Sequence, residues 1–248
     1  KIIKIGAGVT LLILIALAGF ILWAQTPSGP MPEALAALQS TADVEVVTSE
    51  WLIFKPANKA SENGLIIYPG GRVDPRSYAP SAAAIAQQGY LVVITPMPLN
   101  LAVFSPALAL EVQQTFPEIK NWSIAGHSLG GAMAANLIRN NPQAFDGLIL
   151  WASYPAENDN LNEVDIRTLS IHASLDGLTT PEKIEATRHL LPESTTWVVI
   201  DGGNHAQFGW YGDQNGDNPA QIDRDQQQDI IIQATLAFLS EIKMEIQP

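Results

Sequence analysis

The chain has 248 residues, no cysteine and a formal net charge of −12 at pH 7. This length suits one α/β domain with a substantial core, and the lack of cysteine excludes disulfides, thiolate metal sites and a cysteine nucleophile. The acidic balance disfavours nucleic acid as a partner, and it also disfavours anionic membrane surfaces, because both would repel the protein.

The first feature in chain order is an apolar run at residues 5–23, which contains no charge and no proline. Its length is close to the roughly 20 residues that span a bilayer, and it exceeds the roughly 7 to 15 apolar residues usual in a cleaved signal peptide. We therefore expect a single transmembrane helix as an N-terminal membrane anchor at residues 1–24, with a cleaved signal peptide as the alternative. Lys1 and Lys4 precede the run, so the positive-inside bias places the rest of the chain on the extracytoplasmic side.

A stretch rich in proline and small residues follows at 25–32 and is expected to form an extended linker, which leaves residues 33–248 for the domain. The expected strands lie at 44–54 (one or two), 65–68, 90–95, 122–125, 147–151, 168–173 and 196–200, and the expected helices at 33–39, 77–88, 107–115, 132–139, 181–190 and 224–243. Nearly continuous apolar strands that alternate with helices predict an α/β fold with a mostly parallel central β-sheet flanked by helices. Ligands of such sheets bind at the carboxyl ends of the strands.

The segment Gly126-His127-Ser128-Leu129-Gly130 joins one of these strands to a helix. A sharp strand-to-helix turn forces its central residue into a strained conformation and requires small residues two positions before and after it. Gly126 and Gly130 occupy those positions. The pattern is typical of a nucleophile elbow, in which the Ser128 hydroxyl is exposed and the Leu129 N–H lies at the positive end of a helix.

A serine nucleophile needs a base, and the chain has four histidines. His127 is expected to point to the opposite side of the turn from Ser128 and to pack behind it. His172 falls inside a strand and His189 on a charged helix face. His205 lies in a glycine-rich loop after the last strand, at the sheet edge where Ser128 is also expected, so we select it as the base.

The base needs an orienting acid, and the order serine, acid, histidine favours Asp176. Asp176 follows the strand at 168–173 by a short loop, at the same edge of the sheet. Asp201 is the alternative, but it leaves the same strand as His205 only four residues earlier and would need an unusual loop to reach the imidazole.

The motifs that identify a family are Tyr68-Pro-Gly-Gly71, Gly126-His-Ser-Leu-Gly130, Leu175-Asp176-Gly177 and Gly203-Asn-His205-Ala-Gln-Phe208. With them the chain resembles the α/β-hydrolase superfamily, and within it the small, lidless, dienelactone-hydrolase-like serine hydrolases. The resemblance implies that Ser128 attacks the substrate, that His205 serves as general base and acid, and that Asp176 orients the imidazole.

The resemblance also implies an oxyanion hole, with the Leu129 N–H as one donor. We select the N–H of Gly71 as the other donor. The N–H of Arg72, the next residue, is the alternative. The substrate-binding wall is expected from the apolar segments at 96–104 and 208–211, with Arg72, Phe104 and Trp210 as candidate substrate-binding residues.

Residues 213–217, Asp-Gln-Asn-Gly-Asp, alternate oxygen-bearing side chains as calcium loops do. Compared with an EF-hand, the glycine is at the fourth position instead of the sixth, and Arg224 stands at the twelfth, where a bidentate glutamate is needed. We therefore interpret the segment as a solvated loop. No metal ligand set and no cofactor motif is recognised, and no cofactor is expected.

Two functions remain at this point. The first is a membrane-anchored serine hydrolase that cleaves carboxylic esters or related acyl bonds of a small-molecule substrate through an acyl-enzyme intermediate. The second is a catalytically silent hydrolase fold that serves as a binding module of the cell envelope. The complete set of serine, acid and histidine in the expected order favours the first.

Overall fold

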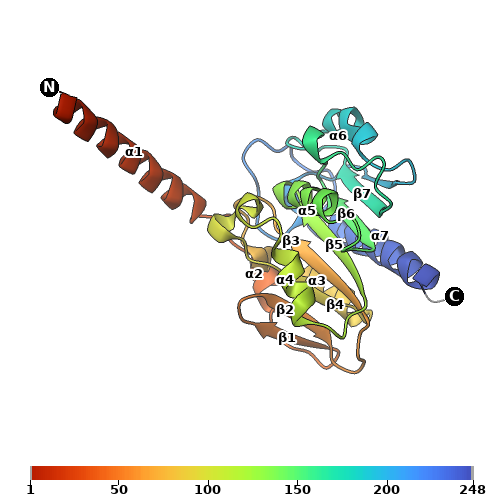
Figure 1. The fold of residues 1–248 in the computed structure, drawn as a ribbon. Coiled ribbons are helices and arrows are strands. Elements are labelled where there is room, and N and C mark those ends of the chain that lie inside the picture. Colours follow the sequence, from red (N-terminus) through yellow and green to blue (C-terminus); the bar gives the residue numbers. More distant parts are fainter. Residues whose placement is uncertain (1, 247–248) are drawn as a thin grey trace.

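The computed structural model describes residues 2–246, with side chains described from residue 11 to residue 242. One sheet of eight strands organises the fold, in the order β1-β2-β4-β3-β5-β6-β7-β8 (Figure 1). The strands are β1 (Val44–Thr48), β2 (Leu52–Pro56), β3 (Asn63–Tyr68), β4 (Leu91–Ile94), β5 (Asn121–His127), β6 (Gly147–Trp151), β7 (Arg167–Ala173) and β8 (Thr196–Ile200). β2 pairs antiparallel with both β1 and β4. All pairings among β3 to β8 are parallel. The prediction of a mostly parallel sheet is confirmed.

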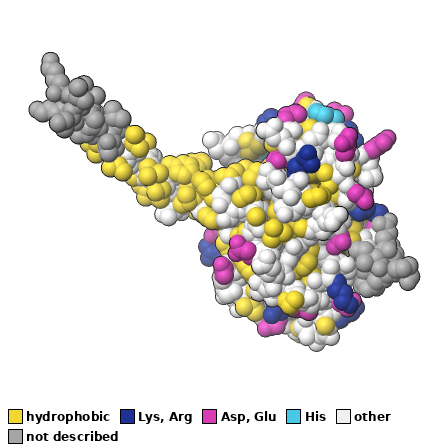
Figure 2. Space-filling view, viewed as in Figure 1, with side chains coloured by type: hydrophobic (Ala, Val, Ile, Leu, Met, Phe, Trp, Pro, Cys, Tyr) yellow, Lys and Arg dark blue, Asp and Glu magenta, His cyan; other side chains and the backbone are white. Residues whose placement is uncertain are grey.

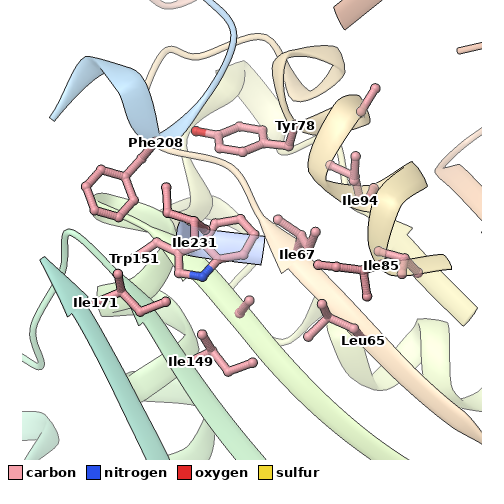
Figure 3. Close-up of a cluster of buried hydrophobic side chains, with 14 of the residues drawn as sticks. Leu65, Ile67, Tyr78, Ile85, Ile94, Ile149, Trp151, Ile171, Phe208 and Ile231 are labelled. Carbon is pink, nitrogen blue, oxygen red and sulfur yellow. The ribbon is translucent and has the colours of Figure 1, made fainter. Parts of the chain in front are cut away.

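Helices cover both faces of this sheet. The α-helices of the described residues are α1 (Ile2–Ala24), α2 (Pro32–Ala36), α3 (Ala79–Gln87), α4 (Leu108–Thr115), α5 (Leu129–Asn140), α6 (Pro181–Thr187) and α7 (Arg224–Ile246), of which α1 does not cover the sheet. One buried cluster packs the sheet against α3 and α7, and it includes Ile67 and Ile85 (Figure 3). A second cluster on the other face packs the sheet against α4 and α5, and it includes Ile66. Successive strand residues point to opposite faces, which explains why these strands are apolar throughout.

Two boundaries differ from those expected from the sequence in a way that matters for function. The helix expected at 132–139 begins at Leu129, immediately after Ser128. The helix expected at 77–88 is divided, because a short 3-10 turn at Pro75–Tyr78 precedes α3 and the Asp74 carboxylate caps that turn by accepting from the Arg76 N–H. The first change places the nucleophile candidate directly at a helix amino terminus.

The amino-terminal helix α1 extends away from the domain (Figure 1). Its large side chains from Leu11 to Trp23 are mostly exposed, and they form a hydrophobic band in Figure 2. Among the described residues, no helix combines the length and the apolar character that crossing a membrane requires. The anchor expected at residues 1–24 therefore gains no support from the structure, and its first ten residues lie outside those whose side chains are described.

Candidate active site

Ser128 occupies the turn between β5 and α5 with a φ of 51° and a ψ of −121°. A positive φ is strained for a residue with a side chain and is held only where the surroundings enforce it. A Cβ on Gly130 would lie 2.3 Å from the Tyr68 carbonyl oxygen, and one on Gly126 would lie 2.4 Å from the Gly131 nitrogen. The two glycines are therefore needed for the turn to pack against its neighbours.

Neighbouring strands fix the backbone of Ser128. Its N–H donates to the Trp151 carbonyl at 3.0 Å, and its own carbonyl accepts from the Ser153 hydroxyl at 2.6 Å. Both partners come from the end of β6 or the residues just after it. Both backbone groups of Ser128 are thus tied to β6 and the residues just after it, which maintains the strained conformation.

A buried carboxylate and imidazole lie together at the carboxyl ends of β7 and β8. Asp176 Oδ2 is 2.7 Å from His205 Nδ1, and both side chains are almost fully buried. Asp176 Oδ1 accepts from the N–H groups of Leu178 and Thr179 at 2.8 and 2.6 Å. These bonds fix the carboxylate with Oδ2 directed at the ring. A carboxylate partner makes Nδ1 the protonated nitrogen, so Nε2 carries a free lone pair.

The loop that carries His205 is held by helix α7. Gln227 bonds both backbone groups of Asn204, accepting from its N–H at 2.9 Å and donating to its carbonyl at 2.7 Å. Arg224 donates to the carbonyl oxygens of Ala206 and Gly209 on the other side of the histidine. The imidazole is therefore carried by a loop with hydrogen-bonded neighbours before and after it.

The Nε2 atom of His205 is buried and has no hydrogen-bond partner within the described part of the chain. The ring lies beside the elbow, because its centre is 4.6 Å from the ring centre of His127, the residue before Ser128. Hydrogen bonds between a nucleophile and its base are often long in unliganded sites and tighten with substrate. An unengaged Nε2 on a ring that packs against the residue before Ser128 is suited to accept the hydroxyl proton.

His127 is fully buried and its ring packs against the loop that carries His205. Its ring stacks on Phe208 at 5.7 Å, and its Nδ1 is 2.8 Å from the Tyr78 hydroxyl. That hydroxyl also accepts from the Gly70 N–H at 2.9 Å, so its own proton is directed at Nδ1. Burial, followed by the charge of His205, holds the pKa of His127 well below its usual range. A neutral His127 thus links the elbow to the glycine loop after β3.

Gly71, in the loop after β3, lies next to Leu129, the residue that follows Ser128. A Cβ on Gly71 would lie 3.0 Å from Cδ2 and 3.5 Å from Cβ of Leu129, so the two residues are neighbours. Arg72 donates its N–H to the Asn100 carbonyl at 2.8 Å, whereas the N–H groups of Gly71 and Leu129 make no hydrogen bond in the described structure. Of the two candidates after β3, the geometry leaves the Gly71 N–H available to an oxyanion.

The three candidate substrate-binding residues lie in different surroundings. The Arg72 guanidinium donates to the carbonyls of Trp23 and Thr26 at 2.8 and 2.6 Å, so it is committed to the end of α1. Phe104 is half exposed and packs edge-on against Phe20 of the same helix. Trp210 is buried. The structure thus brings the first two to α1, and places the third in the interior.

A cavity of about 430 Å³ opens beside the Gly71 loop. It is lined by Trp23, Ser28, Gly71, Arg72, Val73, Leu101, Asp213, Gln214 and Asn215. The lining combines apolar side chains with uncharged polar groups, one carboxylate and the Arg72 side chain. The cavity adjoins the candidate site through Gly71.

The remaining candidates lie apart from this cluster. Asp201 is exposed and accepts from the Ser174 hydroxyl at 3.1 Å, and His189 is exposed on the surface next to Glu157. His172 is buried in β7 and packs edge-on against Trp197. In the described part of the chain, no three histidine, aspartate or glutamate residues come together as metal ligands.

Comparisons with known proteins agree with this architecture. A family model described as alpha/beta hydrolase family matches residues 64–229. A metagenome-derived lipolytic enzyme from the LipS and LipT pair has a TM-score of 0.58 and 16% identity, with 82% of this chain and 100% of that chain covered. Esterase 2 of Thermogutta terrifontis, phosphoramylated by tabun, has a TM-score of 0.59 and 14% identity, covering 82% and 96%.

A structure described as a predicted CIB-like hydrolase from Thermoplasma acidophilum has a TM-score of 0.56 and 13% identity, with 78% of this chain and 97% of that chain covered. No match is found among curated proteins. At these identities the structural likeness concerns the fold, whereas the family model covers most of the domain.

Proposed function

The chain belongs to the alpha/beta hydrolase family, and we propose that it is a serine hydrolase that cleaves carboxylic esters or related acyl bonds of small molecules. Ser128 is the nucleophile, His205 the general base and acid, and Asp176 the residue that orients the imidazole. The family prediction made from the sequence is confirmed. The narrower likeness to dienelactone-hydrolase-like enzymes stays a prediction.

In the proposed first half-reaction, Ser128 Oγ attacks the acyl carbon while its proton moves to His205 Nε2. The substrate carbonyl becomes an oxyanion, and the N–H groups of Leu129 and Gly71 donate to it. The buried Asp176 carboxylate stabilises the imidazolium. The tetrahedral intermediate then collapses, the bond to the alcohol oxygen breaks, and the Nε2 proton passes to that oxygen to release the alcohol.

The second half-reaction restores the enzyme. Water takes the place of the alcohol and attacks the acyl-serine carbon, and His205 Nε2 accepts its proton. The second oxyanion collapses, the bond to Ser128 Oγ breaks, and the proton returns to that oxygen. The products are a carboxylic acid and the free enzyme. Groups attached to the acyl or alcohol side extend into the cavity beside Gly71.

The observation that carries the proposal is the buried bond between Asp176 and His205 at 2.7 Å, with the unengaged Nε2 beside the elbow. Buried polar groups normally have partners, and a buried imidazole nitrogen without one is typical of a site that acts on a proton. The binding-module alternative gives no reason to retain this arrangement with two free N–H donors next to the serine.

A fluorophosphonate probe separates the enzyme from the binding module. We expect the purified chain to be labelled once, at Ser128, because only an activated serine displaces fluoride at a useful rate. Ser128→Ala is expected to remove the label, and Ser49→Ala, at an exposed turn serine, is expected to label as the wild type does. Intact protein that stays unlabelled would favour the catalytically silent module.

We further propose, on the apolar run at residues 5–23 alone, that the hydrolase domain is attached to a membrane on its extracytoplasmic side. Protease added to spheroplasts that express the full chain is expected to remove the domain by cleavage in the linker at 25–32. The chain should also stay in the membrane pellet after carbonate washing. Protection of the domain until the membrane is permeabilised would place it in the cytoplasm.

A further inference from the structure

Asp217 lies in the loop between β8 and α7, in the segment whose sequence suggested a solvated turn. Its side chain accepts hydrogen bonds from two backbone N–H groups that are far apart in sequence. Oδ1 accepts from Gly177 at 2.9 Å, and Oδ2 accepts from Ala206 at 2.8 Å. Gly177 directly follows Asp176, and Ala206 directly follows His205. One carboxylate therefore joins the two backbone segments that carry the buried acid and imidazole.

We propose that Asp217 is a positioning residue, which sets the distance and angle of the hydrogen bond between Asp176 Oδ2 and His205 Nδ1. Its effect on turnover rests on the proposed function, whereas its effect on that hydrogen bond does not. Among the described residues the carboxylate makes no hydrogen bond to Ser128 or to the His205 ring, so it acts through the two loops that it holds together.

The backbone around Asp217 is packed closely against the loop after β7 that carries Asp176, here called the acid loop. A Cβ on Gly177 would lie 2.7 Å from the Gly216 carbonyl oxygen and 2.9 Å from the Asn218 nitrogen. On the histidine side, the Asn204 side chain donates to the Asn218 carbonyl at 2.8 Å. The segment 216–218 thus contacts both loops directly, and the two bonds of Asp217 lie at the centre of this contact.

The acid loop shows why a carboxylate is needed at this place. The N–H groups of Leu178 and Thr179 are both taken by Asp176 Oδ1, which leaves the Gly177 N–H to be satisfied from outside the loop. Asp217 Oδ1 accepts it, and the same oxygen accepts from the Asn218 N–H at 2.9 Å. Because Oδ2 is occupied by the Ala206 N–H, both oxygens of Asp217 serve as acceptors.

This requirement makes Asp217→Asn a sharp test, because the variant keeps the size of the side chain but replaces one accepting oxygen with an NH₂ group. That group cannot accept, so either Ala206 or Gly177 loses its partner. We expect kcat on a p-nitrophenyl ester to fall by about 10- to 100-fold, since small displacements of reacting groups have costs of this size. KM should change by less than about threefold, because Asp217 does not touch the substrate.

The matched control is Asp229→Asn, which removes the same charge from an exposed position on α7 and is expected to leave kcat unchanged. A second readout does not depend on turnover. The proton between His205 Nδ1 and Asp176 should give a strongly downfield proton NMR signal in the wild type and in Asp229→Asn. In Asp217→Asn this signal should shift upfield or broaden through faster exchange with water.

The outcomes separate the proposals. If Asp217→Asn retains the wild-type kcat and downfield signal, Asp217 has no positioning role. If the signal changes while even the wild type neither turns over nor labels, the positioning role stands and the hydrolase proposal fails. Should the variant not fold, amide exchange in the wild type decides: slow exchange at Gly177 and Ala206 supports the two bonds, and fast exchange at either overturns them.

Discussion

Replacing Asp176 with asparagine is expected to lower kcat by up to roughly 10⁴-fold, as the analogous change does in serine proteases. Asp176 Oδ1 is already committed to the N–H groups of Leu178 and Thr179. In the variant, the amide oxygen would stay on those donors and the NH₂ group would face His205 Nδ1. The imidazole would then carry its proton on Nε2, the tautomer that cannot accept from Ser128. The measurement is steady-state hydrolysis of a p-nitrophenyl ester at constant pH.

Asp201→Asn is the matched control for this loss, because it makes the same chemical change in the other acid near the carboxyl edge. Asp201 is exposed and bonds the Ser174 hydroxyl, so we expect an effect of less than about threefold on kcat, as for most surface substitutions. If the two variants changed places, with the large loss at Asp201, the acid of the triad would have been assigned to the wrong loop.

The elements of the fold were predictable because strands in a parallel sheet covered on both faces are apolar throughout and alternate with helices. The sequence also indicated that Ser128, Asp176 and His205 lie at one sheet edge, since each follows a strand directly or after a short loop. Glycines at 126 and 130 indicated the sharp turn, and the structure gives the physical reason, which is the lack of space for a Cβ at either position.

The surroundings of these residues were not predictable, because they depend on loops that meet only in three dimensions. The pairing of Tyr78 with His127 joins residues 49 positions apart, and Asp217 bonds the N–H of Gly177 40 positions away. No local pattern indicates such contacts. Arg72 was a candidate substrate-binding residue, but its guanidinium bonds the end of α1, and that partner cannot be read from the loop sequence.

Removing the proposed base should have a larger effect on turnover than replacing the acid. His205→Ala is expected to lower kcat by about 10⁶-fold, the size found for the histidine of another serine hydrolase triad. Without Nε2 there is no acceptor for the Ser128 proton, although the two N–H donors next to the serine remain. Fluorophosphonate labelling should slow in parallel, because the probe needs the same activated oxygen. Rapid labelling of the variant would indicate a different base.

His127 is the decisive comparison, because its ring centre is only 4.6 Å from that of His205. His127→Asn keeps an acceptor for the Tyr78 hydroxyl, so we expect kcat to fall by less than about tenfold. A loss as large as that of His205→Ala would make His127 the base.

His127 should also affect how the stability of the fold depends on pH. Burial lowers the pKa of His127 in the folded chain, whereas in the unfolded chain it has its usual value of about 6.5. As the pH falls below about 6.5, His127 binds a proton in the unfolded chain but not in the folded chain. The free energy of unfolding therefore decreases. His127→Asn removes this proton uptake, so its free energy of unfolding should fall less steeply between about pH 6.5 and 5 than that of the wild type. Urea titrations at several pH values measure the difference, and equal slopes would mean that His127 is charged in the fold and does not act as the neutral acceptor of Tyr78.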